Sequence, residues 1–513
     1  MVGWWWLPLA AAFTVARADI VEERCAAQRS AAAPKDLAAE AAFNPPNRCR
    51  GWPLLRKLRG GPGSRSPRDV VAGAADPALL DGGVIAVDVV ACGNGTFGRS
   101  LSVFLSAYSE RARGAAVAVA GSGASRLSVR LGALAPGTYT VKARLHFYGD
   151  DCDGKAPVYL GGSEPRCAPR AKCRVPRLDP VCDALARVPF APTTVVVPAR
   201  DGPSMPADDA TPRQCRDGAA GGGHWRSFAG RERDGTAAEE ARGEYTGLPI
   251  APLVEQSVHR RDPKMANWRY HRNECAYHYF GGVEAKACLS RTLIAFVGDS
   301  LMRGLYATTV RLLGGAASDE AMKVSERNAG DPSKSTVFEL ENGAKLVYLS
   351  MWSDAELPSV KVRLAKVAEK KKKNRDRTVV VGNWGAEHSV ASSCETVIPK
   401  FEKQASKSLA AVASALGGRI DDLVLASPTA MLARRNPGMS YAKAAALGDV
   451  LARQAVAART RGAVTSATLL DLHNLTLGRF DDATLDGVHY GQTAATMGGV
   501  ALLNILCERP VSY

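Results

Sequence analysis

Residues 293–305 read Leu-Ile-Ala-Phe-Val-Gly-Asp-Ser-Leu-Met-Arg-Gly-Leu, and this stretch decides the fold class of the C-terminal part of the chain. Five apolar residues in succession are typical of a short buried strand. Gly298 allows a tight turn, and Ser300 opens a segment with the pattern of a helix. A strand, a turn and a helix in this order would present the serine hydroxyl at the carboxyl end of the strand.

The residues that follow alternate between strand and helix patterns. Strands are predicted at 292–297, 335–340, 345–350, 378–382, 421–427 and 467–471. A helix begins near Ile398 and is stopped by Gly417 and Gly418, and two further helices cover 439–460 and 491–507. Repeated strand-then-helix units predict an α/β domain with a mostly parallel sheet covered on both faces. Ligands of such sheets bind beyond the carboxyl ends of the strands, which is where Ser300 would lie.

A second motif, Asp486-Gly487-Val488-His489, precedes the last predicted helix. A serine hydroxyl becomes an effective nucleophile when an imidazole takes its proton, and a carboxylate commonly orients that imidazole. Asp486 and His489 are three residues apart, so in a turn both side chains can point the same way. Each motif alone is equally well a turn or a capped helix start, but their order favours a catalytic triad of Ser300, His489 and Asp486.

An acyl-transfer site also needs donors for the oxyanion of its tetrahedral intermediate. The N–H of Ser300 at a helix start would supply one. The predicted strand 378–382 ends in Gly382-Asn383, so the amide of Asn383, with Gly382 beside it, is the second candidate. Gly343 is a further candidate, as a glycine that follows the second predicted strand.

Residues 82–198 have the pattern of a smaller β-sandwich domain. Val84–Val90 and Thr138–Phe147 are predicted strands, and residues 101–105 alternate with the period of two that strands require. Gly93–Gly98 matches G-x-G-x-x-G, but a dinucleotide loop needs a following helix, whereas the next residues alternate as in a strand. We therefore interpret Gly93–Gly98 as a hairpin turn, and predict no tightly bound cofactor and no metal site.

The N-terminal part of the chain predicts entry into the secretory pathway. Residues 1–18 combine an apolar run with Ala16-Arg17-Ala18, a cleavage site of the signal-peptide kind; the alternative is an uncleaved anchor that associates the protein with a membrane. Residues 19–80, rich in Ala, Pro, Gly and Arg, are predicted to be a stem, and residues 199–214 a linker.

Cysteine content and charge agree with that route. The chain has 12 cysteines and no Cys-x-x-Cys pair, which favours disulfides over zinc or redox sites. Asn94-Gly95-Thr96 and Asn474-Leu475-Thr476 are glycosylation acceptors. The net charge is +15, with its densest basic run at Lys370–Arg377, which is interpreted as a solvated segment rather than a polysaccharide or membrane contact. An exported chain of this kind is not expected to bind nucleic acid.

The order of these motifs resembles the SGNH (GDSL-like) hydrolase superfamily over residues 290–513. Gly298-Asp299-Ser300-Leu301-x-Arg303 and Asp486-x-x-His489 are similar to its PC-esterase branch, which includes trichome birefringence-like, neurexophilin/PC-esterase and Cas-type O-acetyltransferase proteins. Residues 215–290, with their cysteines and tryptophans, resemble the lead-in of that branch, so 215–513 is predicted to be one domain. The β-region before it resembles the immunoglobulin-like domain of the neurexophilin/PC-esterase family. One departure is that Gly382-Asn383-Trp384 replaces the superfamily's usual Gly-x-Asn-Asp.

The resemblance implies a three-layer α/β/α domain whose Ser300–His489–Asp486 triad forms an acyl-enzyme. It implies transfer or hydrolysis of acetyl groups on a glycan or polysaccharide, in the Golgi lumen or outside the cell. Transfer is the favoured expectation, with acetyl-CoA or an acetylated carrier as the acyl donor. The alternative is a non-catalytic glycan-binding or adhesion protein whose α/β domain is a relic.

Overall fold

The structure is a computed structural model of the whole chain. It describes residue 23 and residues 71–73, 77–80, 84–91, 102–109, 112–119, 124–132, 134, 136–147, 194–198, 214–218, 223–227, 268–272, 275–314, 335–369, 376–386, 394–430, 441–478, 488–490 and 492–508. The chain divides into two compact units, one formed by residues 1–204 with 433–438, the other by 205–432 with 439–513.

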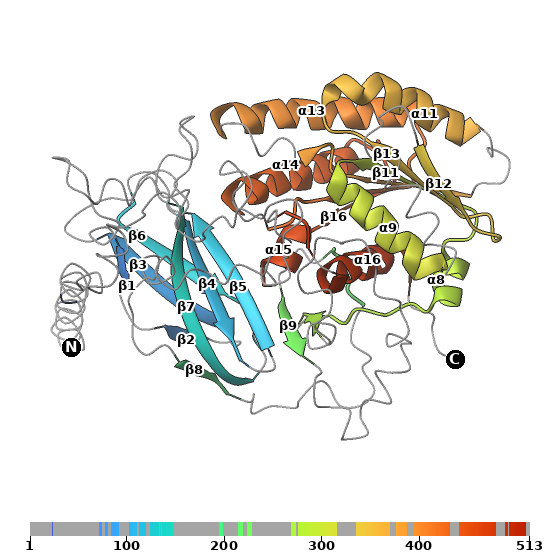
Figure 1. Cartoon of the computed structure of the whole chain (residues 1–513). Helices are drawn as coiled ribbons and strands as arrows, with labels where there is room; N and C mark the ends of the chain where they lie inside the picture. The colour runs from blue at the N-terminus through green and yellow to red at the C-terminus, as the bar shows by residue number, and fades with distance from the viewer. Residues whose placement is uncertain are drawn as a thin grey trace, which may run out of the picture. The chain divides into compact units, whose positions relative to one another are not determined.

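The N-terminal unit contains two antiparallel sheets (Figure 1). In the first sheet β3 is central, and β1, β2 and β6 pair with it. In the second sheet β5, β4, β7 and β8 pair in that order. The bounds are β1 Val71–Gly73, β2 Ala78–Leu80, β3 Val84–Ala91, β4 Ser102–Tyr108, β5 Ala112–Val119, β6 Arg126–Leu131, β7 Gly137–Phe147 and β8 Thr194–Val197.

Alternating burial explains how these strands form a core. Ile85, Val87 and Val89 of β3 are fully buried, and so are Val103 and Leu105 of β4. A period of two places these residues on one face of each strand, where burial of apolar surface stabilises the unit. The strands predicted near 84–90, 101–105 and 138–147 are present; β5 and β6 lie where no strand was predicted.

The lead-in to the α/β domain contains regular elements. β9 His224–Ser227 and β10 Trp268–His271 form an antiparallel pair, and α8 spans Gly282–Cys288. A disulfide joins Cys215 to Cys275. The indole Nε1 of the buried Trp225 donates to the carbonyl of Leu475, so the lead-in belongs to the same packed unit as the α/β sheet.

The α/β sheet has the strand order β12-β13-β11-β14-β15-β16. All neighbouring pairs are parallel except β12 and β13, which are antiparallel. The bounds are β11 Thr292–Gly298, β12 Ser335–Glu339, β13 Lys345–Ser350, β14 Arg377–Gly382, β15 Asp422–Ala426 and β16 Ser466–Leu470. The predicted mixed α/β fold with a mostly parallel sheet is confirmed.

Helices cover both faces of this sheet (Figure 1). On one face α11 Leu357–Glu369, α13 Cys394–Ala415 and α14 Tyr441–Thr460 pack on the sheet through a continuous apolar cluster. On the other face α9 Ser300–Gly314 lies against α16 Gln492–Leu506, with the six-residue α15 Leu472–Leu477 beside α16. Neither α11 nor α15 was predicted from the sequence.

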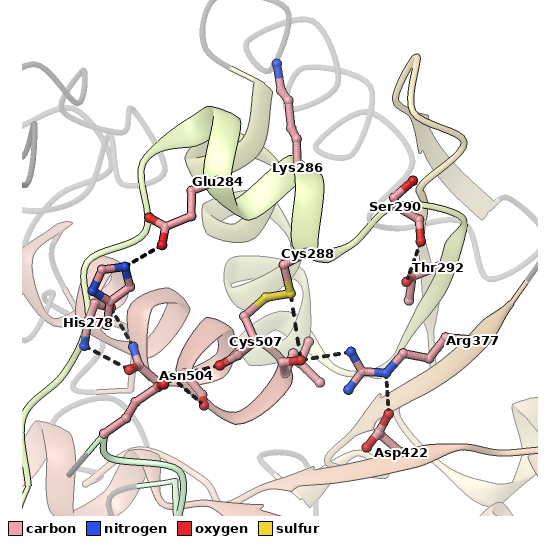
Figure 2. The surroundings of a disulfide bond; sticks show 12 residues. His278, Glu284, Lys286, Cys288, Ser290, Thr292, Arg377, Asp422, Asn504 and Cys507 are labelled. Carbon is pink, nitrogen blue, oxygen red and sulfur yellow. Dashed lines mark hydrogen bonds and ion pairs between the residues drawn. A yellow bond between two sulfur atoms is a disulfide. The ribbon is translucent and has the colours of Figure 1, made fainter. Parts of the chain in front are cut away.

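A second disulfide fastens the end of the chain to α8 (Figure 2). Cys507, directly after α16, is bonded to Cys288, the last residue of α8. Nearby, Asn504 Oδ1 accepts from the backbone N–H of His278, and Asn504 Nδ2 donates to the carbonyl of the same residue. Arg377 adds a hydrogen bond to the carbonyl of Leu506. These contacts hold α16 against both the lead-in and the sheet.

Some of the predicted features lie outside the described residues. They are the leader 1–18, most of the stem and linker, the Gly93–Gly98 turn, the Lys370–Arg375 basic run, and the cysteines between 152 and 182. In the described part of the chain, no helix combines the length and the apolar character needed to cross a membrane.

Candidate active site

Ser300 lies where β11 turns into α9, at the edge of the sheet where the parallel strands end. Its exposed fraction is 5%. The preceding Asp299 caps the helix, because its carboxylate Oδ1 accepts the backbone N–H of Leu301 at 3.0 Å and its carbonyl accepts that of Arg303 at 3.1 Å. The cap fixes the direction in which the first turn of α9 leaves the sheet.

Gly298 is required in this turn by the close approach of β14. A Cβ atom on Gly298 would lie 2.0 Å from Oδ1 of Asn383 and 2.6 Å from Cγ of Met302. Neither neighbour can retreat easily, since both are fully buried. The absence of a side chain therefore lets Asn383 reach the nucleophile turn.

Asn383 and Asp299 form a reciprocal buried pair. Nδ2 of Asn383 donates to Oδ1 of Asp299 at 2.7 Å, and Oδ1 of Asn383 accepts the backbone N–H groups of Asp299 and Gly385 at 3.3 and 3.2 Å. Both side chains have an exposed fraction of 0%. The contacts at Oδ1 and at the carboxylate leave one orientation for the amide, so Nδ2 is held at the turn that carries Ser300.

The neighbouring strand β13 supports the same turn from the other side. The hydroxyl of Tyr348 donates to the carbonyls of Gly298 and Asp299 at 3.3 and 3.2 Å, and the N–H of Met351 donates to Gly298 at 2.8 Å. Tyr348 also packs against the buried Tyr306 of α9, with 6.0 Å between ring centroids. The turn is thus fixed from β13 and β14 before any ligand binds.

His489 meets Ser300 directly. Its Nε2 lies 2.7 Å from Oγ of Ser300, across 189 residues of sequence. When Nδ1 carries the ring proton, Nε2 accepts the hydroxyl hydrogen, which is the arrangement that a general base requires. The imidazole is half-buried.

The segment that carries His489 is held by residues that follow β15. Thr429 Oγ1 donates to the carbonyl of Val488 at 2.6 Å, and the hydroxyl of Tyr490 donates to the carbonyl of Ala430. Both bonds are buried, and they hold the residue on each side of His489. The position of the imidazole is therefore set by two hydroxyl hydrogen bonds between its segment and the residues that follow β15.

A polar cluster lies buried behind this segment. Ser427 Oγ donates to Asp471 and accepts the backbone N–H of His473, and Asp471 caps α15. Burial lowers the pKa of His473, and this outweighs the carboxylates of Asp471 and Asp449, which favour its cation. The neutral imidazole is consistent with a structural role for His473.

The second glycosylation acceptor belongs to the same cluster. Nδ2 of Asn474 donates to Oδ2 of Asp471 at 2.6 Å, and the hydroxyl of Thr476 is buried against the carbonyls of Leu472 and His473. A glycan on Nδ2 would replace one of its two hydrogens and leave the other to hold the bond to Asp471. Asn94 lies outside the described residues.

The structure therefore brings Ser300, His489 and Asn383 to one edge of the sheet. Asp486 lies outside the described residues. Gly382 is paired within the sheet, and a Cβ there would lie 2.9 Å from the ring of Trp384, so its lack of a side chain makes room for that indole.

The prediction for Gly343 is wrong. β12 runs antiparallel to the other strands, so the turn that follows it lies at the opposite edge of the sheet, and the N–H of Gly343 donates to Leu340. The residues that sequence reasoning missed are Tyr348 and Thr429. Tyr348 lies inside the predicted strand 345–350 and Thr429 follows the predicted strand 421–427, but their hydroxyl contacts depend on tertiary packing.

The described residues show no grouping of three or more His, Cys, Asp or Glu side chains that could hold a metal ion.

No protein-family model matches the chain, and no curated protein matches its sequence. The solved structures that this chain resembles at a distance include the following two. A GDSL-like lipase from Bacteroides thetaiotaomicron is 12% identical, with 44% of this chain and 94% of that chain covered and a TM-score of 0.25. A protein assigned as an acylhydrolase from Bacteroides fragilis is 13% identical, with 53% and 95% covered and a TM-score of 0.23.

Proposed function

We propose that this protein is a serine-dependent acyl-transfer enzyme, an esterase or O-acyltransferase. The observation that carries the proposal is the 2.7 Å contact between Nε2 of His489 and Oγ of Ser300. A nucleophile within hydrogen-bond reach of a base is the signature of covalent acyl transfer. The buried supports of both residues add to it, because a preorganised site needs little rearrangement before reaction.

The reaction would begin with attack of Ser300 Oγ on the acyl carbonyl, while His489 takes the hydroxyl proton. The tetrahedral intermediate then collapses to an acyl-enzyme, and His489 returns the proton to the leaving oxygen or sulfur. In the second half, water or an acceptor hydroxyl attacks the acyl-enzyme with His489 again as base. Release of the ester or acid restores Ser300.

The oxyanion of the intermediate would be stabilised by the N–H at the start of α9 and by Nδ2 of Asn383. Nδ2 has two hydrogens, and the bond to Asp299 uses one of them. Asp299 would then act as a positioning residue that aims the second hydrogen. Gly382 stays a lesser candidate for this role. Asp486 is proposed to orient His489 from three residues upstream.

We further propose that the acyl group is acetyl and that the acceptor is a glycan, as the motifs similar to the PC-esterase branch imply. Acetyl-CoA or an acetylated carrier would be the donor if transfer prevails over hydrolysis. The immunoglobulin-like character of the N-terminal unit is part of the same proposal. The two disulfides are compatible with a secreted or lumenal protein.

The experiment is to incubate the purified full chain with labelled acetyl donors and glycan acceptors, and to follow both acetyl transfer and free acetate. Ser300→Ala should lower the rate by about three orders of magnitude or more. Asp486→Asn should lower kcat strongly without changing the fold. An unchanged rate in Ser300→Ala would reject the assignment. The non-catalytic glycan-binding alternative predicts that a reactive-serine probe fails to label Ser300 in the wild-type protein.

A further inference from the structure

One arginine of α9 lies at a partly exposed point of the helix, one turn from the nucleophile. Of residues 300–313 in α9, Arg303 and Gly304 are the two that are not buried. The other arginine of the helix, Arg311, has an exposed fraction of 4%. The helix is therefore accessible to solvent at Arg303 and Gly304, one turn from the nucleophile. The other residues of 300–313 are buried.

Gly304 shows that there is space at this point of the helix. A Cβ atom built on Gly304 would have no heavy atom within 4 Å. Gly298, in the turn before the helix, is by contrast crowded by Asn383 and Met302. Room for a ligand thus lies beside Arg303 and not beneath the nucleophile turn.

The side chain of Arg303 can reach the reacting centre. Residues three apart on a helix are neighbours on its surface, and helical side chains lean toward the N-terminus, which here is Ser300. Among the described residues, no hydrogen bond or ion pair engages the Arg303 guanidinium. A cation that no described carboxylate pairs with, one helical turn from a nucleophile, is suited to receive an anion from a ligand.

We infer that Arg303 binds an anionic group, a carboxylate or a phosphate, on the molecule that Ser300 acylates or deacylates. The planar guanidinium matches both groups through paired N–H donors. The anion would be either the carboxylate of an acidic sugar or a phosphate of a nucleotide-linked acyl donor. This inference rests on the proposed function, and it specifies that the substrate of that function is negatively charged.

The first experiment compares acyl substrates that carry this anionic group with counterparts that lack it. The full chain is assayed on O-acetylated galacturonic acid and on its methyl ester, and on acetyl-CoA and S-acetylpantetheine. The wild-type protein should prefer the anionic member of one pair by about ten- to a hundredfold in kcat/KM. The pair that shows the preference identifies whether the anion belongs to the sugar or to the donor.

Three variants test the residue. Arg303→Gln should bring the preference close to one, and Arg303→Lys should restore part of it, because lysine keeps the charge without the paired donors. Arg459→Gln is the matched control, since it removes the same charge from an exposed position in the last turn of α14. It should keep the wild-type preference. A preference that survives in Arg303→Gln, or equal losses on charged and neutral esters, would overturn the inference.

A binding measurement separates this inference from the proposed function. In a Ser300→Ala background, calorimetric titration with galacturonate and coenzyme A, against their neutral counterparts methyl galacturonate and pantetheine, needs no turnover. Tighter binding of an anion that is lost on adding Arg303→Gln supports the inference even if no ester is cleaved. Equal binding of the charged and neutral members of both pairs rejects it, even if Ser300 proves to be catalytic.

Discussion

Nε2 of His489 lies 2.7 Å from Oγ of Ser300 because the helices that begin beside these residues pack together. Ser300 is the first residue of α9, and His489 precedes α16 by three residues. The two helices lie against each other on one face of the sheet. The contact therefore depends on the placement of α16, and on the bonds that hold the segment before it.

Thr429 should matter for catalysis without touching the substrate. Thr429→Val removes the hydroxyl that donates to the carbonyl of Val488, next to His489. A small displacement of the base can reduce the rate by about a hundredfold, so we expect kcat to fall roughly ten- to a hundredfold with little change in KM. Thr429→Ser keeps the donor and should recover most of the rate. Steady-state kinetics decides, and a wild-type kcat in Thr429→Val would show that this bond does not position the base.

Gly298 and Gly304 should respond in opposite ways to alanine. In Gly298→Ala the added methyl meets Asn383 and Met302, and overpacking of this kind destabilises a core by about 1–3 kcal/mol. In Gly304→Ala the methyl enters open space within a helix, where alanine is favoured by roughly 0.5–1 kcal/mol. Urea unfolding of both variants measures the difference. Equal stability of the two would contradict the crowding around Gly298.

Asn383→Ala tests the oxyanion role. Loss of one oxyanion donor lowers kcat by about 10²–10³. Tyr348→Phe is the control, because it removes a different hydroxyl that supports the same turn but offers no donor to the oxyanion. We expect a much smaller loss of kcat in Tyr348→Phe. Similar losses in the two variants would mean that Asn383 acts only by holding Asp299.

The sheet and the nucleophile turn could be predicted because their signals are local. β11 and β13 are buried along their whole length and appear as continuous apolar runs. The end of α13 is marked by Gly417 and Gly418, whose positive φ values of 69° and 77° suit glycine. Ser300 and His489 could be named because each stands next to such an element.

The missed features depend on contacts that are distant in sequence. α15 has six residues and is held by the Asp471 cap and by packing on α16, so its own pattern is too short to predict a helix. β9 and β10 are separated by the 40 residues between them, and short strands this far apart carry no hairpin signal. The direction of β12 is likewise set by its pairing with β13. This direction could not be predicted locally, and Gly343 was therefore expected at the wrong edge of the sheet.

The buried His473 should make stability depend on pH. Its folded pKa lies below the ordinary value of about 6.5, so the unfolded chain binds the proton more readily. The stability from this residue is fully present above that ordinary value and is lost as pH falls below it, by at most about 1.4 kcal/mol per pH unit. Denaturant unfolding of the wild-type protein and of His473→Gln between pH 7.5 and 5, a range chosen to span about one unit or more on each side of 6.5, measures the slope. A variant with the wild-type slope would exclude His473 as its source.

The disulfide between Cys288 and Cys507 should contribute more to stability than the one between Cys215 and Cys275. It closes 219 residues instead of 60, and in the chain-entropy description this difference corresponds to about 1 kcal/mol. Replacing both cysteines of either pair by serine should lower the free energy of unfolding by about 2–5 kcal/mol. Because Arg377 and Asn504 still hold α16, the Cys288→Ser/Cys507→Ser protein should keep its ester-cleaving rate well below its unfolding temperature. Calorimetry and rate measurements on both double variants provide the check. Loss of activity without loss of stability would instead show that the disulfide itself places α16, and with it the segment that carries His489.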